Sequence, residues 1–63
     1  MNKNEFIKEL GALLQAADER VSEAVLINED NVLITFANGY ERTVCIAGDS
    51  HLAIIKDVVQ AIM

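Results

Sequence analysis

Asp49-Ser50-His51 places an acid, a hydroxyl and an imidazole side by side in this sequence. These residue types form the Ser-His-Asp machinery of many hydrolases, in which the three groups converge in space from separate parts of the chain. Asp and Ser directly before an apolar run are also preferred residues at a helix start. We therefore interpret Asp49 or Ser50 as a helix N-cap, and we predict no catalytic residue and no enzyme activity.

Metal, thiol and cofactor chemistry have little support in the sequence. His51 has no second His or Cys at ligand spacing, so we predict no metal site. The run 29–31, Glu-Asp-Asn, lacks the alternating ligands and distal Glu of a calcium loop and indicates a solvated turn. Cys45 is the only cysteine, which excludes an internal disulfide, and we expect it to be a buried or half-buried structural residue. No Walker, dinucleotide-binding or CxxC motif is present, so we predict no cofactor.

The charge balance restricts the possible partners. Ten acidic residues against five basic ones give a net charge of −5. Binding of nucleic acid through its phosphates needs clustered basic residues, and here they are scattered: Lys3, Lys8, Arg20, Arg42 and Lys56. No apolar run approaches the roughly 20 residues of a membrane span, and the N-terminus lacks the apolar core of a signal peptide. The sequence therefore predicts a cytoplasmic protein without a membrane partner.

The length of the chain limits its stability. A chain of 63 residues forms one domain at most, here residues 1–63, and buries only about 60% of its unfolded surface. Domains this small usually need a disulfide, a metal or a partner. Because 52% of the residues are hydrophobic, we expect apolar surface to remain after folding. With no disulfide or metal site predicted, good packing or self-association must stabilise the fold.

Residues 32–46 predict a β-hairpin around which the other elements are arranged. Apolar and polar residues alternate with period two on both sides of Asn38-Gly39, a strong hairpin signal. A two-residue loop would set apolar side chains beside polar ones, so we prefer a three-residue loop, 37–39, with Gly39 in the left-handed position of a bulge. Arg42 is then expected near a sheet edge with its head in water. The predicted pairs are Phe36 with Tyr40, Ile34 with Arg42, and Val32 with Val44.

A strand over residues 22–27 is predicted to complete a three-stranded antiparallel meander. The polar run 28–31 is typical of a turn, which we expect to be centred on Glu29-Asp30. This turn would pair Ile27 with Val32 and Val25 with Ile34. Val25 and Ile27 would then face the core.

Residues 3–18 predict an amphipathic helix. Asn2 and Glu5 have the spacing of a capping box, and Gly11 would permit close packing on the sheet. Apolar residues recur at intervals of three and four and are expected in the core: Phe6, Ile7, Leu10, Leu13, Leu14 and Ala17.

Residues 52–62 predict a second helix with a wider apolar stripe than one side of a small sheet needs. The stripe contains Leu52, Ile55, Val58, Val59 and Ile62, and Ala53, Ile54 and Ala61 widen it. Such a stripe indicates either deep burial between two elements or contact with a second chain.

The segment NGYERTVCIAGDSHLAIIKDVVQAI, residues 38–62, resembles a pattern in small uncharacterised proteins of phages and prophages. In that pattern an Asn-Gly-Tyr hairpin leads into an alternating strand, an Asp-Ser helix start and an apolar helix. The resemblance implies a bacterial or mobile-element origin. It brings no activity and no functional residues.

The sequence thus predicts an α+β domain of order α-β-β-β-α, with both helices on one face of the meander. We predict a non-enzymatic assembly or protein-interaction module that forms a homodimer or binds another protein. Its contact surface would be the apolar face of helix 52–62 or the edge of strand 40–46. The expected interface residues are Val44, Ile46, Leu52, Ile54, Ile55, Val58 and Ile62. The alternative is a mobile-element regulator that binds nucleic acid through a dimeric patch of Arg20, Arg42 and Lys56.

Overall fold

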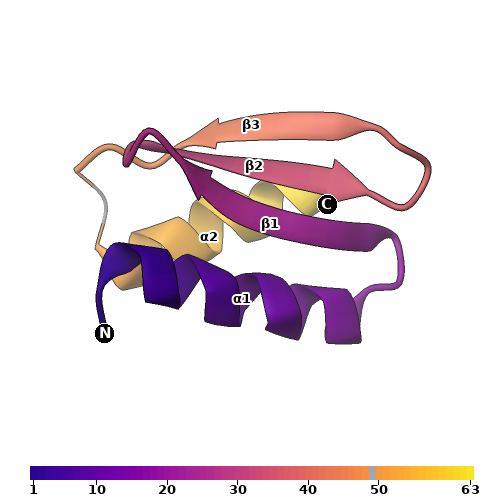
Figure 1. Cartoon of the computed structure of the whole chain (residues 1–63), viewed down its shortest axis with the longest axis horizontal. Coiled ribbons are helices and arrows are strands. Elements are labelled where there is room, and N and C mark those ends of the chain that lie inside the picture. The colour runs from indigo at the N-terminus through magenta and orange to yellow at the C-terminus, as the bar shows by residue number, and fades with distance from the viewer. Residues whose placement is uncertain (49) are drawn as a thin grey trace.

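A computed structural model describes residues 1–48 and 50–63. The elements are α1 (Lys3–Ala17), β1 (Val21–Ile27), β2 (Asn31–Phe36), β3 (Glu41–Cys45) and α2 (His51–Ile62). The strands form an antiparallel sheet in the order β1-β2-β3. Both helices lie beneath the same face of this sheet (Figure 1), which confirms the predicted α+β architecture.

The predicted cap of α1 is present. Asn2 Oδ1 accepts a hydrogen bond from the Glu5 backbone N–H at 2.8 Å, which satisfies one of the unpaired donors at the helix start. The Glu5 carboxylate accepts from the Asn2 side-chain amide at 3.1 Å, so the two side chains bond to each other. The pair fixes where α1 begins and how the chain enters it.

The β2–β3 hairpin has the predicted register. Val32 lies opposite Val44, and Ile34 lies opposite Arg42. The Phe36 N–H donates to the Tyr40 carbonyl at 2.7 Å, closing a three-residue loop. Gly39 has a φ of +88°, the left-handed conformation that this loop requires and that glycine adopts without strain.

The predicted pairing of β1 with β2 is wrong by one residue. Ile27 lies opposite Asn31, and Leu26 lies opposite Val32. The turn is shorter than expected because Asn28 and Glu29 both adopt positive φ, and Asn31 Nδ2 donates to Asn28 Oδ1 at 2.9 Å across it. A shift of one residue turns a strand over. Leu26 therefore packs against the core, whereas Val25 and Ile27 lie on the open face of the sheet.

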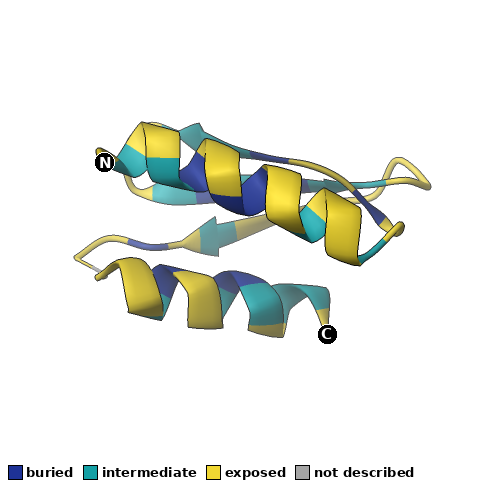
Figure 2. Ribbon diagram, turned by 90° about the horizontal axis from the view of Figure 1, so that it is seen from below, coloured by how far each residue is buried: buried dark blue, intermediate teal, exposed yellow. Residues whose placement is uncertain are grey.

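The core lies between the helices and the face of the sheet that they cover. A bulge between Val21 and Glu23 lets Val21 and Ala24, three residues apart, both point into it. In Figure 2 the buried segments of α1 and α2 lie along the sides of the two helices that face each other. Among residues 1–48 and 50–63, nine hydrophobic residues are buried: Ile7, Leu10, Val21, Ala24, Val32, Ile34, Ile46, Ile54 and Val58.

The core-facing stripe of α1 is narrower than predicted. Its buried positions are Ile7, Leu10 and Gly11. Leu13 is 65% exposed and Ala17 is also exposed, so their predicted burial is wrong. Leu13 lies about 100° of helical rotation away from the line through Ile7 and Leu14, beyond the contact with the sheet.

Ser50 is the N-cap of α2. Its Oγ accepts a hydrogen bond from the Ala53 backbone N–H at 3.2 Å. Asp49, the other predicted cap, lies outside the described residues. Ile54 and Val58, four residues apart, are the fully buried positions of this helix.

Candidate functional site

The seven predicted interface residues lie in three different environments. Ile46, Ile54 and Val58 have no exposed surface and belong to the core of the monomer, so they present nothing to a partner. Val44 and Ile62 are half-buried. Leu52 is 76% exposed and Ile55 is 36% exposed. The structure therefore brings Leu52 and Ile55 to the surface and separates them from the buried members of the set.

An apolar strip runs along the outer side of α2. We call it the α2 stripe and define it as Leu52, Ile55, Val59 and Met63. Spacings of three and four residues place these side chains on one side of a helix. Met63 is 91% exposed and Val59 is half-buried. The sequence located this excess of apolar residues, but it could not separate the α2 stripe from the core side of the helix.

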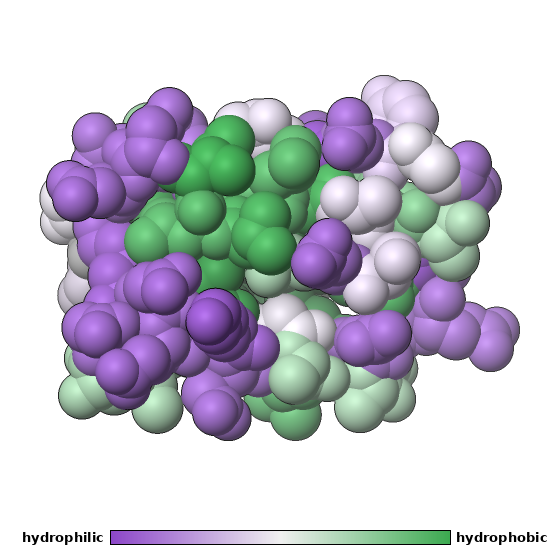
Figure 3. All heavy atoms as spheres, viewed as in Figure 1, coloured by the Kyte–Doolittle hydropathy of each residue, from purple (hydrophilic) through white to green (hydrophobic). Residues whose placement is uncertain are grey.

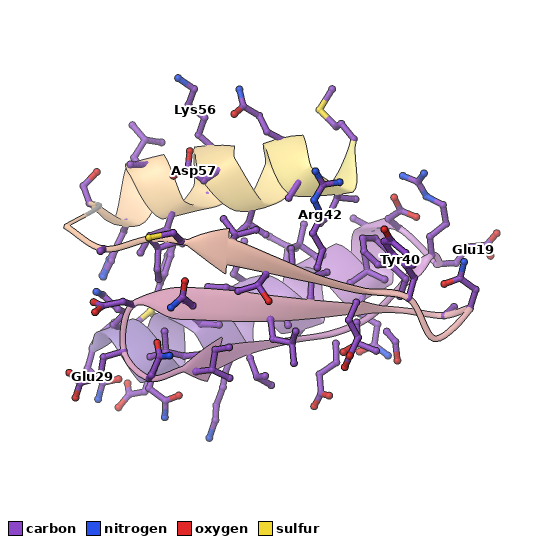
Figure 4. All side chains as sticks on the ribbon, turned by 90° about the horizontal axis from the view of Figure 1, so that it is seen from above. Glu19, Glu29, Tyr40, Arg42, Lys56 and Asp57 are labelled. Atoms are coloured by element: carbon purple, nitrogen blue, oxygen red, sulfur yellow. The ribbon has the colours of Figure 1, made fainter. Side chains whose placement is uncertain are left out.

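The outer edge of β3 carries backbone groups that do not pair with β2. The Phe36 N–H bonds to the Tyr40 carbonyl, and the Ile46 N–H bonds to the Asp30 carbonyl at 2.7 Å. Pairing alternates along an antiparallel strand, so the backbone groups of Glu41, Thr43 and Cys45 point outward. The α2 helix packs against β3 (Figure 4), so this edge and α2 lie on the same side of the molecule.

Cys45 is exposed, so its predicted burial is wrong. Val44 points toward the helices, and alternation along the strand places Cys45 on the open face of the sheet. β3 is an edge strand, so Cys45 has a neighbouring strand, β2, on one side only.

A second apolar surface lies on the open face of the sheet. Val25 lies opposite Leu33, and Ile27 is on the same face; all three are half-buried. Figure 3 shows hydrophobic side chains gathered above α1, over the end of β1. This surface could not be predicted from the sequence because Val25-Leu26-Ile27 is apolar throughout, so alternation does not indicate which side chains face inward.

The polar residues that could suggest catalysis have structural roles. Ser50 Oγ caps α2, and the His51 ring stacks on Phe6 with centroids 4.2 Å apart and planes 6° from parallel. Glu29 lies in the β1–β2 turn, where its carbonyl accepts from Lys3 Nζ at 3.3 Å. Within residues 1–48 and 50–63, no group of three potential metal ligands lies close enough to hold an ion.

Arg20 is neutralised by its neighbour. Its Nη2 lies 2.6 Å from Asp18 Oδ2, and its Nε also donates to that carboxylate. These hydrogen bonds lower the pKa of Asp18 from 3.8 to about 2 and raise the pKa of Arg20. Figure 4 shows Lys56 pointing away from the molecule on α2, whereas Arg42 reaches toward the end of that helix. One monomer does not gather Arg20, Arg42 and Lys56 into a single basic patch.

No known protein family, curated protein or solved structure shows significant similarity to this chain. Neither described helix combines the length and apolar character that crossing a bilayer would require.

Proposed function

We propose that this protein is a non-enzymatic interaction module that forms a homodimer through the α2 stripe. The observation that carries this proposal is the 76% exposure of Leu52 beside Ile55 on a helix whose opposite side fills the core. Removing a fully exposed Leu side chain from water stabilises a contact by about 1.5–3 kcal/mol. A two-fold dimer uses the same surface patch on both copies, so the α2 stripe of one copy packs against the α2 stripe of the other. Each residue of the stripe then contributes twice to the contact.

The size of the contact indicates how far it extends. A standard interface buries about 800 Å² on each partner. That area is roughly a fifth of the 4126 Å² surface of this chain. It is larger than the area that the four side chains of the α2 stripe supply. The dimer contact therefore includes half-buried neighbours such as Ile62 and Val44 and reaches the outer edge of β3.

Nucleic-acid binding is the less favoured proposal. The net charge is −5, and Asp18 already neutralises Arg20. Phosphate binding would need two copies to bring Arg42 and Lys56 together. Protein retained on a DNA column at moderate salt would favour this alternative over a protein-interaction module.

A matched pair of variants tests the α2 stripe. Leu52→Asp places a charge on the stripe, and Leu13→Asp places the same charge on a 65% exposed residue of α1 outside it. Sedimentation equilibrium should show at least a tenfold weaker dimer for Leu52→Asp, since a desolvated unpaired charge costs well over 1.4 kcal/mol. Leu13→Asp should dimerise like the native chain. Equal dimerisation of the two variants would contradict the proposal, and circular dichroism confirms that both are folded.

A further inference from the structure

One pocket combines an apolar floor with cationic groups. It lies where the β2–β3 hairpin meets the C-terminal end of α2, and its volume is about 390 Å³. This is within the range of about 300–1,000 Å³ that small-molecule sites occupy. Its lining includes Phe36, Tyr40, Arg20, Arg42, Ile62 and Met63.

The two aromatic rings lie close together on one side of the pocket. The centroids of Phe36 and Tyr40 are 6.2 Å apart, with their planes tilted by 47°. Tyr40 is 65% exposed, so its ring offers a free face to a ligand. Ile62 and Met63 provide apolar surface from α2. This combination suits a flat or branched apolar group.

Arg42 provides the charge. Among the described residues, the Arg42 guanidinium makes no hydrogen bond and no ion pair, whereas Arg20 pairs with Asp18. Figure 4 shows the Arg42 side chain extending from β3 toward the C-terminal end of α2, with Tyr40 nearby at the hairpin. An Arg fork binds a carboxylate through two parallel hydrogen bonds, which an ammonium group does not do.

We propose that this pocket binds a carboxylate attached to an aromatic or branched apolar group. Arg42 holds the carboxylate, and the apolar group lies against Tyr40, Phe36 and Ile62. Two sources have this chemistry: a free aromatic acid, and the C-terminal residue of a peptide. The proposal does not require a dimer, because one chain supplies the whole pocket lining; the pocket shares Met63 with the α2 stripe and Ile62 with the wider dimer contact.

NMR titration tests the carboxylate requirement directly. The probes are 3-phenylpropionate, the peptide acetyl-Gly-Gly-Phe with a free carboxyl end, and the same peptide with an amide end. We expect saturable shifts of the Arg42, Tyr40 and Ile62 signals with at least one of the two acids, and at least tenfold weaker binding of the amide. Binding of 3-phenylpropionate alone would identify free acids as the source, and binding of the peptide acid would identify peptide ends. Saturation by neither acid at millimolar concentration, or equal binding of the amide, would overturn the proposal.

A second pair of variants tests the role of Arg42. Arg42→Met keeps an apolar stem and removes the guanidinium, whereas Lys56→Met removes a positive charge from α2 outside the pocket lining. Arg42→Met should weaken binding of the acid at least tenfold, and Lys56→Met should change it less than about twofold. Equal effects of the two substitutions would show that overall charge attracts the acid and would contradict the assigned site. Both residues are exposed, so both variants should fold, which their NMR spectra would confirm.

Discussion

Gly11 sets the distance between α1 and β1. A Cβ added at this position would lie 2.9 Å from the Ala24 carbonyl oxygen and 3.3 Å from the Ala24 Cβ. The first contact is with backbone, which cannot rotate away as a flexible side chain can. The glycine in the middle of α1 lowers helix propensity but permits a close contact with the sheet.

Substituting Gly11 with Ala should therefore destabilise the protein. The clash should cost about 1–3 kcal/mol, more than the gain of about 1 kcal/mol in helix propensity. Urea denaturation measures the balance. Ala12→Gly, at the next and exposed position, should cost about 1 kcal/mol and measures propensity alone. A Gly11→Ala protein more stable than the native chain would contradict the close contact.

The Asp18–Arg20 pair should make stability depend on pH in acid. The pKa of Asp18 is about 2 in the folded chain, below its ordinary 3.8. A carboxyl with a lowered folded pKa stabilises the fold above its unfolded pKa, and this contribution is lost as the pH falls from 3.8 to about 2. The effect is small because the pair is exposed and screened.

Urea midpoints between pH 6 and pH 2 should detect this loss. Asp18→Asn should lower the midpoint at pH 6 and reduce the decrease below pH 3.8, because Asn cannot titrate. Glu19→Gln removes a neighbouring exposed carboxylate without affecting the ion pair and should keep the native decrease. Parallel pH profiles for native and Asp18→Asn protein would contradict the assignment.

Among the elements, the β2–β3 hairpin could be predicted from the sequence down to its register. Both strands alternate clearly, and the Asn38-Gly39 pair restricts the loop. β1 could not be predicted as fully, because Val25, Leu26 and Ile27 are all apolar and two registers bury apolar side chains equally well. The deciding feature was the left-handed conformation of Asn28 and Glu29, which is rare for Glu.

For the candidate site, the sequence predicted that α2 carries more apolar residues than the core needs, but it did not predict which of them are exposed. Periodicity identifies one apolar arc, and only the packed structure shows where burial ends within it. Leu52 and Val58 belong to the same arc, yet Leu52 is 76% exposed and Val58 is buried. The pocket beside Arg42 combines β2, β3 and α2, so no local pattern indicated it.

The two helices contact each other through the stacked rings of Phe6 and His51. A double-mutant cycle with Phe6→Leu and His51→Ala should give a coupling free energy of about 0.5–1.5 kcal/mol in urea denaturation. A second cycle with Phe6→Leu and Lys56→Ala should give a value near zero, because Lys56 points away from the molecule. A coupling equal in both cycles would show that the stack does not connect the helices.

At the scale of the whole molecule, a small core coexists with unburied apolar surface. The chain has 63 residues and one cysteine, and nine hydrophobic residues are buried in the part of the chain that the structure describes. Among the described residues, apolar side chains remain at the surface in the exposed α2 stripe and in the half-buried open-face residues around Leu33. Surfaces of this kind usually mark contacts with other molecules. The α2 stripe is the more exposed of the two and is our proposed dimer contact.

The solution mass of the native chain is the decisive measurement for the proposed homodimer. Light scattering on a sizing column, from micromolar to near-millimolar protein, should give twice the chain mass of 6.9 kDa and a decrease toward 6.9 kDa on dilution. Such a transition would establish self-association, which the Leu52→Asp variant should then weaken at least tenfold. A folded protein of 6.9 kDa at every concentration would contradict the homodimer proposed here.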